Sequence, residues 1–323
     1  MKKIFITGGA GYVGSKLVPK LLALGYEVTV LDLMIYGESV LDDHNKLKKV
    51  KGDIRDKSLL EKLIPGHNIL IHLACISNDP SFELNPALGK SINYDAFEPL
   101  VKISSDNNVN RFIYASSSSV YGIKKEKNVT EDMKLEPLTD YSKFKGECEK
   151  ILNNYKSENF ATTTIRPSTV CGYAKRQRLD LVVNILTNHA FHNREIKVFG
   201  GDQLRPNVHI DDMVDSYVAV LDAPTKKING QIFNVGFKNQ SVNELADDVK
   251  EVIGDDVKII NSKSDDNRSY HVSSEKIKEI LDFKTKFSVK DAVLDLKIAF
   301  EKKTLINTFN DEFFFNIKRM NNI

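Results

Sequence analysis

The sequence predicts an α/β protein with a doubly wound parallel sheet and a smaller C-terminal α/β lobe. Short apolar runs alternate with amphipathic helical stretches through about the first 165 residues, a pattern typical of parallel strands joined by right-handed crossovers. A glycine-rich turn directly follows the first apolar run. The length of 323 residues also exceeds one average domain and allows a large core.

The expected strands of the N-terminal part are short and apolar or β-branched, as in a sheet covered by helices on both faces. They are Lys3–Thr7, Glu27–Leu31, Lys48–Lys51, Ile69–Leu73, Arg111–Ala115 and Ala161–Arg166. Helical periodicity marks the segments between them: Val13–Leu24, Lys57–Leu63, Ala96–Asn107 and Asp140–Ser157.

The rhythm changes after Arg166-Pro167, where a polar, basic loop (Gly172–Asp180) begins. The elements expected beyond it are Leu181–Phe191, Ile196–Phe199, Asp211–Leu221, Ile232–Val235, Val242–Ile253, Val257–Ile260 and a terminal helix, Val289–Lys302. We therefore divide the chain into residues 1–166 and a lobe of residues 167–323. Residues 205–240 are expected to return to the first unit, because Gly230–Gly236 resembles one more core strand.

Composition points to an ordinary globular protein. Hydrophobic residues make up 41%, charged residues 28%, and the net charge is +2, which favours neither a nucleic acid nor a membrane as partner. With no signal-like segment and no apolar run of about 18 residues, we expect a soluble, cytoplasmic protein. Cys75, Cys148 and Cys171 lie far apart without C-x-x-C spacing, so neither a disulfide framework nor a metal site is expected.

Gly8, Gly11 and Gly14 lie between an expected strand and an expected helix. In a dinucleotide site such glycines permit the tight turn, the backbone approach to a diphosphate and close helix packing. The helix N-terminus adds free N–H groups and partial positive charge. Asp32 ends the next strand, where an acid accepts hydrogen bonds from the adenosine ribose and repels a 2′-phosphate. Asp53 ends the following strand and is expected to cap the adenine amine.

Tyr141 and Lys145 are four positions apart on an expected helix and so share one face. A free tyrosine has a pKa near 10, and lowering it to neutrality takes ~3 units, or roughly 4 kcal/mol. A neighbouring ammonium and an oxidised nicotinamide ring, both cationic, would supply that preference for the phenolate. Ser117 would then hydrogen-bond the reacting hydroxyl.

These motifs together resemble the extended short-chain dehydrogenase/reductase proteins of the nucleotide-sugar epimerase/dehydratase group. The resemblance spans roughly residues 1–300. It rests on Thr7–Gly14, Asp32, Asp53, His72-Leu73-Ala74, Asn93, Ser116–Gly122, Tyr141, Lys145, Arg166-Pro167, Arg205–Asp211 and Phe233–Gly236.

The resemblance implies a Rossmann-type domain that binds NAD and a C-terminal lobe that binds a nucleoside-diphosphate sugar. It also implies a homodimer joined by the helices near 96–107 and 140–157. The cofactor residues expected on this basis are Gly8, Gly11, Tyr12, Val13, Asp32, Asp53, Ile54, Leu73, Ala74, Asn93, Ser116, Tyr141, Lys145 and Pro167. The expected catalytic residues are Ser117, Tyr141 and Lys145, and the expected substrate residues are Ser117, Ser118, Thr169, Asn184, Arg205 and Arg268. Arg205 and Arg268 are the candidates for the substrate diphosphate, because a guanidinium fork suits phosphate oxygens.

The reaction is narrowed by Ser118 and Ser119, which follow the catalytic serine. Dehydratases and decarboxylases of the group carry acidic residues there, and a serine hydroxyl is too weakly acidic to replace them. The reaction that remains is oxidation of a sugar hydroxyl, at C4. We place a 4-epimerase first and a 4-dehydrogenase that releases the keto sugar second. Thr169 stands where epimerases commonly carry Asn, and residues 178–184 resemble those of bacterial GDP-heptose 4-dehydrogenases, which implies a surface-polysaccharide sugar.

Other polar residues have two interpretations each. Lys175, Arg176 and Arg178 either assist the diphosphate or form a solvated basic loop, and we favour the loop. Residues 77–79 either meet the hexose or form an Asn-Asp-Pro turn. We expect His72 and His209 to be structural.

The aromatic tail, residues 309–315, covers either the lobe or a dimer interface. The alternative from another class is an NAD(P)-sensing regulator without catalysis. Such proteins usually lose the tyrosine or the lysine, and both are present here.

We expect the protein to bind NAD more tightly than NADP. Asp32 would repel a 2′-phosphate, and Leu33 and Met34 offer no compensating arginine. Replacing a hydrogen bond to a charged group by repulsion implies a preference of roughly tenfold or more. Titration of the protein with each dinucleotide measures it, and a clear preference for NADP would contradict the interpretation of Asp32.

Overall fold

The computed structural model describes residues 2–126, 128–263, 269 and 271–322. Within them, a seven-stranded parallel sheet has the order β10-β6-β5-β4-β1-β2-β3. Its strands are β1 (Lys3–Thr7), β2 (Glu27–Asp32), β3 (Leu47–Lys51), β4 (Ile69–His72), β5 (Arg111–Ala115), β6 (Ala161–Pro167) and β10 (Gln231–Val235). The order reverses between β1 and β4, and in such sheets the ligand crevice opens at this reversal. The predicted doubly wound fold is confirmed.

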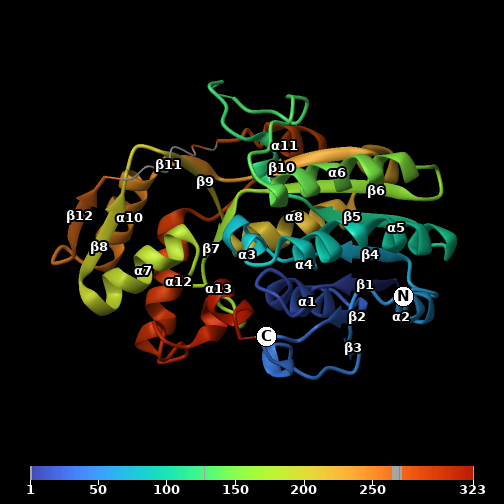
Figure 1. The fold of residues 1–323 in the computed structure, drawn as a ribbon, viewed down its shortest axis with the longest axis horizontal. Helices are drawn as coiled ribbons and strands as arrows, with labels where there is room; N and C mark the ends of the chain where they lie inside the picture. The colour runs from blue at the N-terminus through green and yellow to red at the C-terminus, as the bar shows by residue number, and fades with distance from the viewer. Residues whose placement is uncertain (1, 127, 264–268, 270, 323) are drawn as a thin grey trace.

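Helices cover both faces of this sheet (Figure 1). α1 (Gly14–Ala23) and α8 (Ile210–Asp222) bury apolar side chains on one face, together with Ile4 and Ile6. α2 (Lys57–Leu63), α5 (Phe97–Asp106) and α6 (Asp140–Tyr155) cover the other face. Phe5 points to that second face because successive strand residues alternate.

The second lobe lies beside the carboxyl ends of the central strands (Figure 1). It holds a three-stranded sheet of β7 (Thr169–Cys171), β9 (Leu204–His209) and β11 (Lys238–Ser241), and a parallel pair of β8 (Glu195–Phe199) and β12 (Lys258–Ser262). Its helices α7 (Val182–Asn193), α10 (Val242–Ile253) and α12 (Val289–Glu301) share one apolar core.

The remaining elements are short. They are α3 (Asp79–Glu83), α4 (Pro86–Lys90), α9 (Thr225–Ile228), α11 (Glu275–Leu281), α13 (Asn316–Met320), a π-helical turn η2 (Ser91–Asp95) and the 3₁₀ turns η1 (Glu38–Val40), η3 (Ser118–Tyr121) and η4 (Glu312–Phe314).

The six strands predicted for the N-terminal part all form, each within one residue of its expected ends. The strand expected within 230–236 is also confirmed, because β10 pairs with β6. The sequence analysis missed β7, β9 and β11. β9 reads Leu-Arg-Pro-Asn-Val-His and has no apolar alternation, so its strand conformation depends on pairing with the two neighbouring strands.

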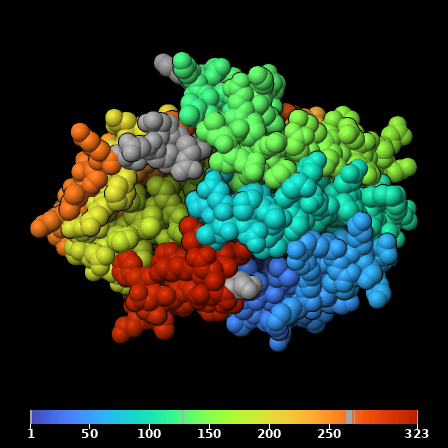
Figure 2. Space-filling model, viewed as in Figure 1, coloured from blue at the N-terminus to red at the C-terminus, as the bar shows by residue number. Residues whose placement is uncertain are grey.

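The C-terminal tail covers the second lobe and then reaches the first. Phe309 packs against the rings of His189 and His192, and the Leu179 N–H donates to the Phe314 carbonyl, 2.9 Å away. In Figure 2 the C-terminal residues, in red, lie below the cyan segment that includes α3, and α13 contacts α3. No helix in the described part of the chain is both long and apolar enough to cross a membrane.

A buried ion pair joins α6 to the central sheet. Arg166 on β6 and Glu149 on α6 are 2% and 5% exposed, with 2.6 Å between Arg166 Nη2 and Glu149 Oε2. Glu149 also accepts a hydrogen bond from Ser116, which precedes the expected catalytic serine. Arg166 Nη1 donates to the Tyr121 hydroxyl at 2.6 Å. The ion pair therefore fixes the position of α6 relative to the serine run at residues 116–119.

We predict that Glu149→Ala lowers the free energy of unfolding by about 3–5 kcal/mol, because it leaves the Arg166 charge buried and uncompensated. Glu147, two residues earlier on the same helix, pairs at the surface with Lys150, and Glu147→Ala should cost only about 0–1 kcal/mol. Urea denaturation of both variants measures the difference, and equal losses would contradict a structural role for the buried pair.

Candidate active site

A cavity of about 870 Å³ opens at the carboxyl ends of the central strands, between the two lobes. Its walls come from the ends of β1, β2, β4, β5 and β6 and from the loop after β7. This is the crevice expected where the strand order reverses. Its volume falls within the range of sites for small molecules and cofactors.

The turn after β1 leaves no room for side chains at two of its glycines. Gly8 has a φ of +76°, and a Cβ there would lie 2.4 Å from the Ala74 nitrogen. A Cβ on Gly14 would lie 2.4 Å from the Gly9 oxygen. Only glycine allows the turn to pack this closely against the ends of β4 and α1. The turn therefore has the shape of the predicted diphosphate cradle.

Two acids at strand ends face the same cavity. Asp32 accepts hydrogen bonds from the Ala10 N–H at 3.0 Å and the Met34 N–H at 2.8 Å, while burial raises its pKa. Asp53 forms an ion pair with Arg55, with 2.6 Å between Oδ2 and Nη2. This hydrogen-bonded arginine lowers the pKa of Asp53. Both side chains are thus held in place by neighbouring groups.

Most of the residues predicted to bind a cofactor or a substrate line this cavity. They are Gly8, Gly11, Tyr12, Val13, Asp32, Asp53, Ile54, Leu73, Ala74, Ser116, Ser117, Ser118, Tyr141, Lys145, Pro167, Thr169 and Arg205. Arg268 lies outside the described residues. The cavity brings together side chains from both lobes, as the predicted roles require, and the roles themselves stay predictions.

Asn93 and Asn184 do not line the cavity, although direct contacts were predicted for both. Asn93 is buried and exchanges hydrogen bonds of 2.8 and 2.9 Å with the backbone of Ile76. Asn184 accepts from the Gly172 N–H at 3.0 Å and donates to the Tyr12 hydroxyl at 3.0 Å. The side-chain amides of both residues hydrogen-bond neighbouring segments. They therefore support the wall of the cavity without lining it.

Tyr141 and Lys145 project from the first turns of α6. Thr139 caps this helix by accepting the Ser142 N–H at 3.3 Å. The ammonium of Lys145 donates to the Ala115 carbonyl at 2.7 Å and lies 5.8 Å from the centre of the Tyr141 ring. The carbonyl at the end of β5 thereby holds the lysine ammonium near the Tyr141 ring.

The surroundings of Tyr141 favour its neutral form. Burial raises the pKa of the phenol, Cys75 and Asp79 add to this effect, and Arg178 opposes it. The expectation that Tyr141 works as a base therefore depends on cationic charge delivered beside it. Ser117 caps η3, and its Oγ lies 2.8 Å from Ser119 Oγ.

The basic loop after β7 is not solvated, contrary to our expectation for two of its residues. Arg176 and Arg178 are only 4% and 8% exposed and line the cavity, whereas Lys175 is exposed and pairs with Asp42. Arg178 forms a two-pronged ion pair with Asp180, with N–O distances of 2.8 and 3.2 Å. The C-terminal tail covers the end of the loop at Leu179 and Asp180.

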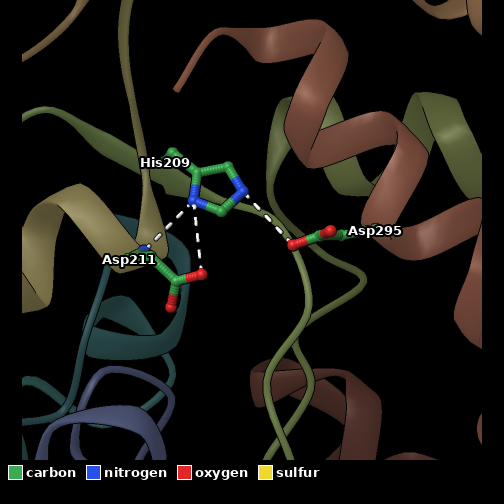
Figure 3. A group of neighbouring side chains, drawn as sticks. All are labelled: His209, Asp211 and Asp295. Carbon is green, nitrogen blue, oxygen red and sulfur yellow. Dashed lines mark hydrogen bonds and ion pairs between the residues drawn. The ribbon is translucent and has the colours of Figure 1, made fainter. Parts of the chain in front are cut away.

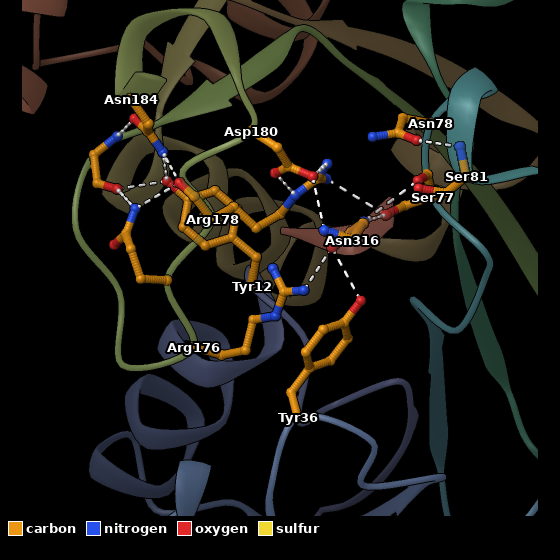
Figure 4. A network of polar contacts seen from close by, with 12 residues as sticks. Tyr12, Tyr36, Ser77, Asn78, Ser81, Arg176, Arg178, Asp180, Asn184 and Asn316 are labelled. Atoms are coloured by element: carbon orange, nitrogen blue, oxygen red, sulfur yellow. Dashed lines mark hydrogen bonds and ion pairs between the residues drawn. The ribbon is translucent and has the colours of Figure 1, made fainter. Parts of the chain in front are cut away.

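Sequence reasoning missed Tyr36 and Asn316, which also line the cavity (Figure 4). Asn316 begins α13, accepts hydrogen bonds from Tyr36 at 3.0 Å and Arg176 at 2.6 Å, and donates to Ser77 at 2.8 Å. Tyr36 follows β2, so a scan of strand ends extended by a few residues could have found it. Nothing local marks Asn316, because the partners of its side chain lie 140 or more positions away.

Residues 77–79 lead into a short helix. Asn78 caps α3, accepting the Ser81 N–H at 3.0 Å, so the expected Asn-Asp-Pro turn is the start of a helix, and the contact with the hexose stays a prediction. All three residues also line the cavity. His72 is 2% exposed, lies 2.6 Å from Thr7 Oγ1 and stacks on Tyr114. Burial lowers its pKa to about 3, and the expected structural role is confirmed.

His209 caps α8 beside two acids, Asp211 and Asp295 (Figure 3). Its Nδ1 accepts the Asp211 N–H at 3.1 Å. Its Nε2 lies 3.3 Å from Oδ2 of Asp295 on α12. His209 thus joins α8 to α12, which confirms the structural role expected for it.

Comparisons with known proteins agree with this geometry. The profile of the NAD dependent epimerase/dehydratase family matches residues 4–236. The UDP-glucose 4-epimerase of Lactobacillus helveticus is 28% identical over 313 residues, which cover 90% of this chain and 94% of that protein. The dTDP-glucose 4,6-dehydratase of Streptomyces niveus is 24% identical over 316 residues, covering 91% of each.

A similar solved structure is the crystal structure of the UDP-glucose 4-epimerase of Thermotoga maritima with UDP-glucose. It matches with a TM-score of 0.85 and 25% identity, over 94% of this chain and 100% of that one. The glycine turn and the acids at the strand ends fit the family's cofactor. The chain therefore belongs to the NAD-dependent epimerase/dehydratase family of nucleotide-sugar enzymes, and its cofactor is NAD.

Proposed function

We propose that this enzyme is a 4-epimerase of a nucleoside-diphosphate sugar. The observation that carries the proposal is the serine run at the end of β5. Ser117, Ser118 and Ser119 all line the cavity beside Tyr141 and Lys145. A site with this tyrosine and lysine, but without acids after the serine, suits oxidation of a hydroxyl and not elimination of water.

Two carboxylates that line the cavity near the serine run and the loop after β7, those of Asp79 and Asp180, already have partners. Asp180 is held in its ion pair with Arg178. Asp79 accepts hydrogen bonds from Thr139 and Ser142 at the start of α6. A general acid for dehydration must be free to give up a proton toward the leaving hydroxyl. Both bonding patterns therefore argue against a 4,6-dehydratase.

The chain's own residues would act as follows. Ser117 hydrogen-bonds the C4 hydroxyl of the sugar, and the Tyr141 phenolate takes its proton. Lys145 stabilises the phenolate through its positive charge. Bound NAD supplies a reversible hydride acceptor. Tyr141 then returns its proton to the C4 oxygen after the sugar has turned its other face, so that one tyrosine is base and acid in each cycle.

For the substrate, we propose that Arg205 binds the diphosphate and that Ser118 and Thr169 contact the sugar. All three line the cavity. The roles given to Arg268 and Asn184 stay predictions. A surface-polysaccharide precursor as substrate, a cytoplasmic location and a homodimer through α5 and α6 belong to this proposal as well.

The second candidate is a 4-dehydrogenase that releases the keto sugar. It is favoured by Thr169, which lines the cavity where epimerases commonly carry Asn. Four residues of the segment 178–184, which resembles that of GDP-heptose 4-dehydrogenases, also line the cavity: Arg178, Asp180, Leu181 and Val182. The choice depends on whether the ketone leaves before the hydride returns.

The test is incubation with UDP-, GDP-, dTDP- and CDP-sugars, heptoses included, with products analysed by NMR and NADH followed by absorbance. An isomerised sugar without net NADH is the expected result. A keto sugar with stoichiometric NADH would establish the dehydrogenase instead.

We predict that Tyr141→Phe lowers turnover in that assay by about 10²–10⁴-fold, the usual contribution of a general base. NAD binding should stay near the wild-type value, since only a hydroxyl is lost. Tyr155→Phe on the same helix is the matched control, because its hydroxyl meets Glu98 at the surface. Full activity of Tyr141→Phe would instead revive a non-catalytic, NAD-sensing role.

A further inference from the structure

Arg176 is a buried cation without a carboxylate partner among the described residues. Its side chain is 4% exposed and lines the NAD-binding cavity. Its Nε and Nη1 make no hydrogen bond with any described residue. The nearby carboxylate of Asp180 already forms an ion pair with Arg178. A buried charge left in this state is costly unless something else compensates it.

The guanidinium is nevertheless held in one orientation. It stacks on Tyr36, with 3.6 Å from Cζ to the ring centre, and its Nη2 donates to Asn316 Oδ1 at 2.6 Å. Figure 4 shows Arg176 and Tyr36 side by side, both hydrogen-bonded to Asn316. Burial lowers the pKa of Arg176 to about 10, and the charge of Arg178 acts in the same direction, while Tyr36 and Asp180 oppose this shift only in part. A bound anion would reverse both effects.

The position of Arg176 indicates which anion this is. Its backbone N–H donates to Ser15 Oγ at 3.3 Å, at the start of α1. Tyr36 follows β2, and Asp32 ends it. Arg176 thus lies beside the first turn of α1, which follows the glycine turn, and lines the same cavity as Asp32. The negative charge of NAD resides in its diphosphate, and arginine's planar fork suits phosphate oxygens.

We propose that Arg176 binds the diphosphate of NAD from the second lobe. Tyr36 and Asn316 fix its guanidinium, so the C-terminal helix α13 helps to keep the dinucleotide in the enzyme between turnovers. This assignment rests on NAD being the cofactor and is independent of whether the enzyme is an epimerase or a dehydrogenase.

The test measures how fast the enzyme as purified exchanges its bound NAD for labelled NAD. Arg176→Met and Arg176→Gln remove the charge, and Arg176→Lys keeps it. Lys175→Met is the matched control, because it makes the same change one residue earlier at an exposed ion pair. Circular dichroism and gel filtration check the fold of each variant.

We expect the two neutral variants to exchange NAD roughly 10- to 100-fold faster than wild type, the range for losing hydrogen bonds to a charged group. Arg176→Lys should fall between them and wild type, because it restores charge without the fork. Lys175→Met should stay within about twofold. If Arg176→Met does not fold, the NAD exchange rates of Arg176→Gln and Arg176→Lys test the proposal.

Wild-type exchange in the neutral variants would overturn the assignment. If those variants also bound UDP or GDP more weakly, Arg176 would belong to the substrate diphosphate instead. Equal acceleration in all three Arg176 variants would show that shape matters and charge does not, which also overturns it. None of these readouts depends on sugar turnover, so a wrong choice of reaction would leave the test intact.

Discussion

The structure depends on the reversal of strand order between β1 and β4 in an all-parallel sheet. At that point the crossover helices lie on opposite faces of the sheet, and the carboxyl ends of the strands are left open. The glycine turn, Asp32, Asp53 and the serine run all belong to these ends. Because no side chain fits at Gly8 or Gly14, the turn can press against Ala74 and α1. The order of the strands thus sets where the site lies, and the residues at the strand ends set its chemistry.

Residues that act through local sequence could be predicted. The glycine spacing, the acid at the end of β2 and the Tyr-x-x-x-Lys pair each derive their meaning from one strand end or one helix face. The strands of the main sheet were found because their apolar runs report burial directly. The same local logic failed for β9, whose polar sequence becomes a strand only through its neighbours β7 and β11.

Long-range packing accounts for the rest. A run of Lys, Arg and Gln after β7 is usually solvated, yet Arg176 and Arg178 are buried because Asn316 and the tail close over them. Asn93 and Asn184 were expected as ligand contacts on the basis of the family resemblance, whereas in the structure their amides hydrogen-bond backbone groups and neither residue lines the cavity. Such positions depend on partners more than a hundred residues away or on loop geometry, and neither is visible in local spacing.

The buried phenol of Tyr141 and the buried guanidinium of Arg176 have one feature in common. Within the chain alone, the surroundings of Tyr141 disfavour its phenolate and Arg176 has no carboxylate partner among the described residues, and both side chains face the same cavity. A cationic ring beside Tyr141 and an anionic diphosphate beside Arg176 would improve both together. Such an arrangement favours binding of the dinucleotide whichever of the two proposed reactions the enzyme performs.

The most direct measurement is therefore the fate of the hydrogen on C4. A substrate that carries deuterium at C4 is converted by the enzyme, and the product and the NADH pool are analysed by NMR and mass spectrometry. The epimerase account predicts that deuterium remains on C4 of the inverted sugar and that none appears in free NADH. Deuterium in NADH, with a keto sugar that has lost it, would contradict the account and make the enzyme a dehydrogenase.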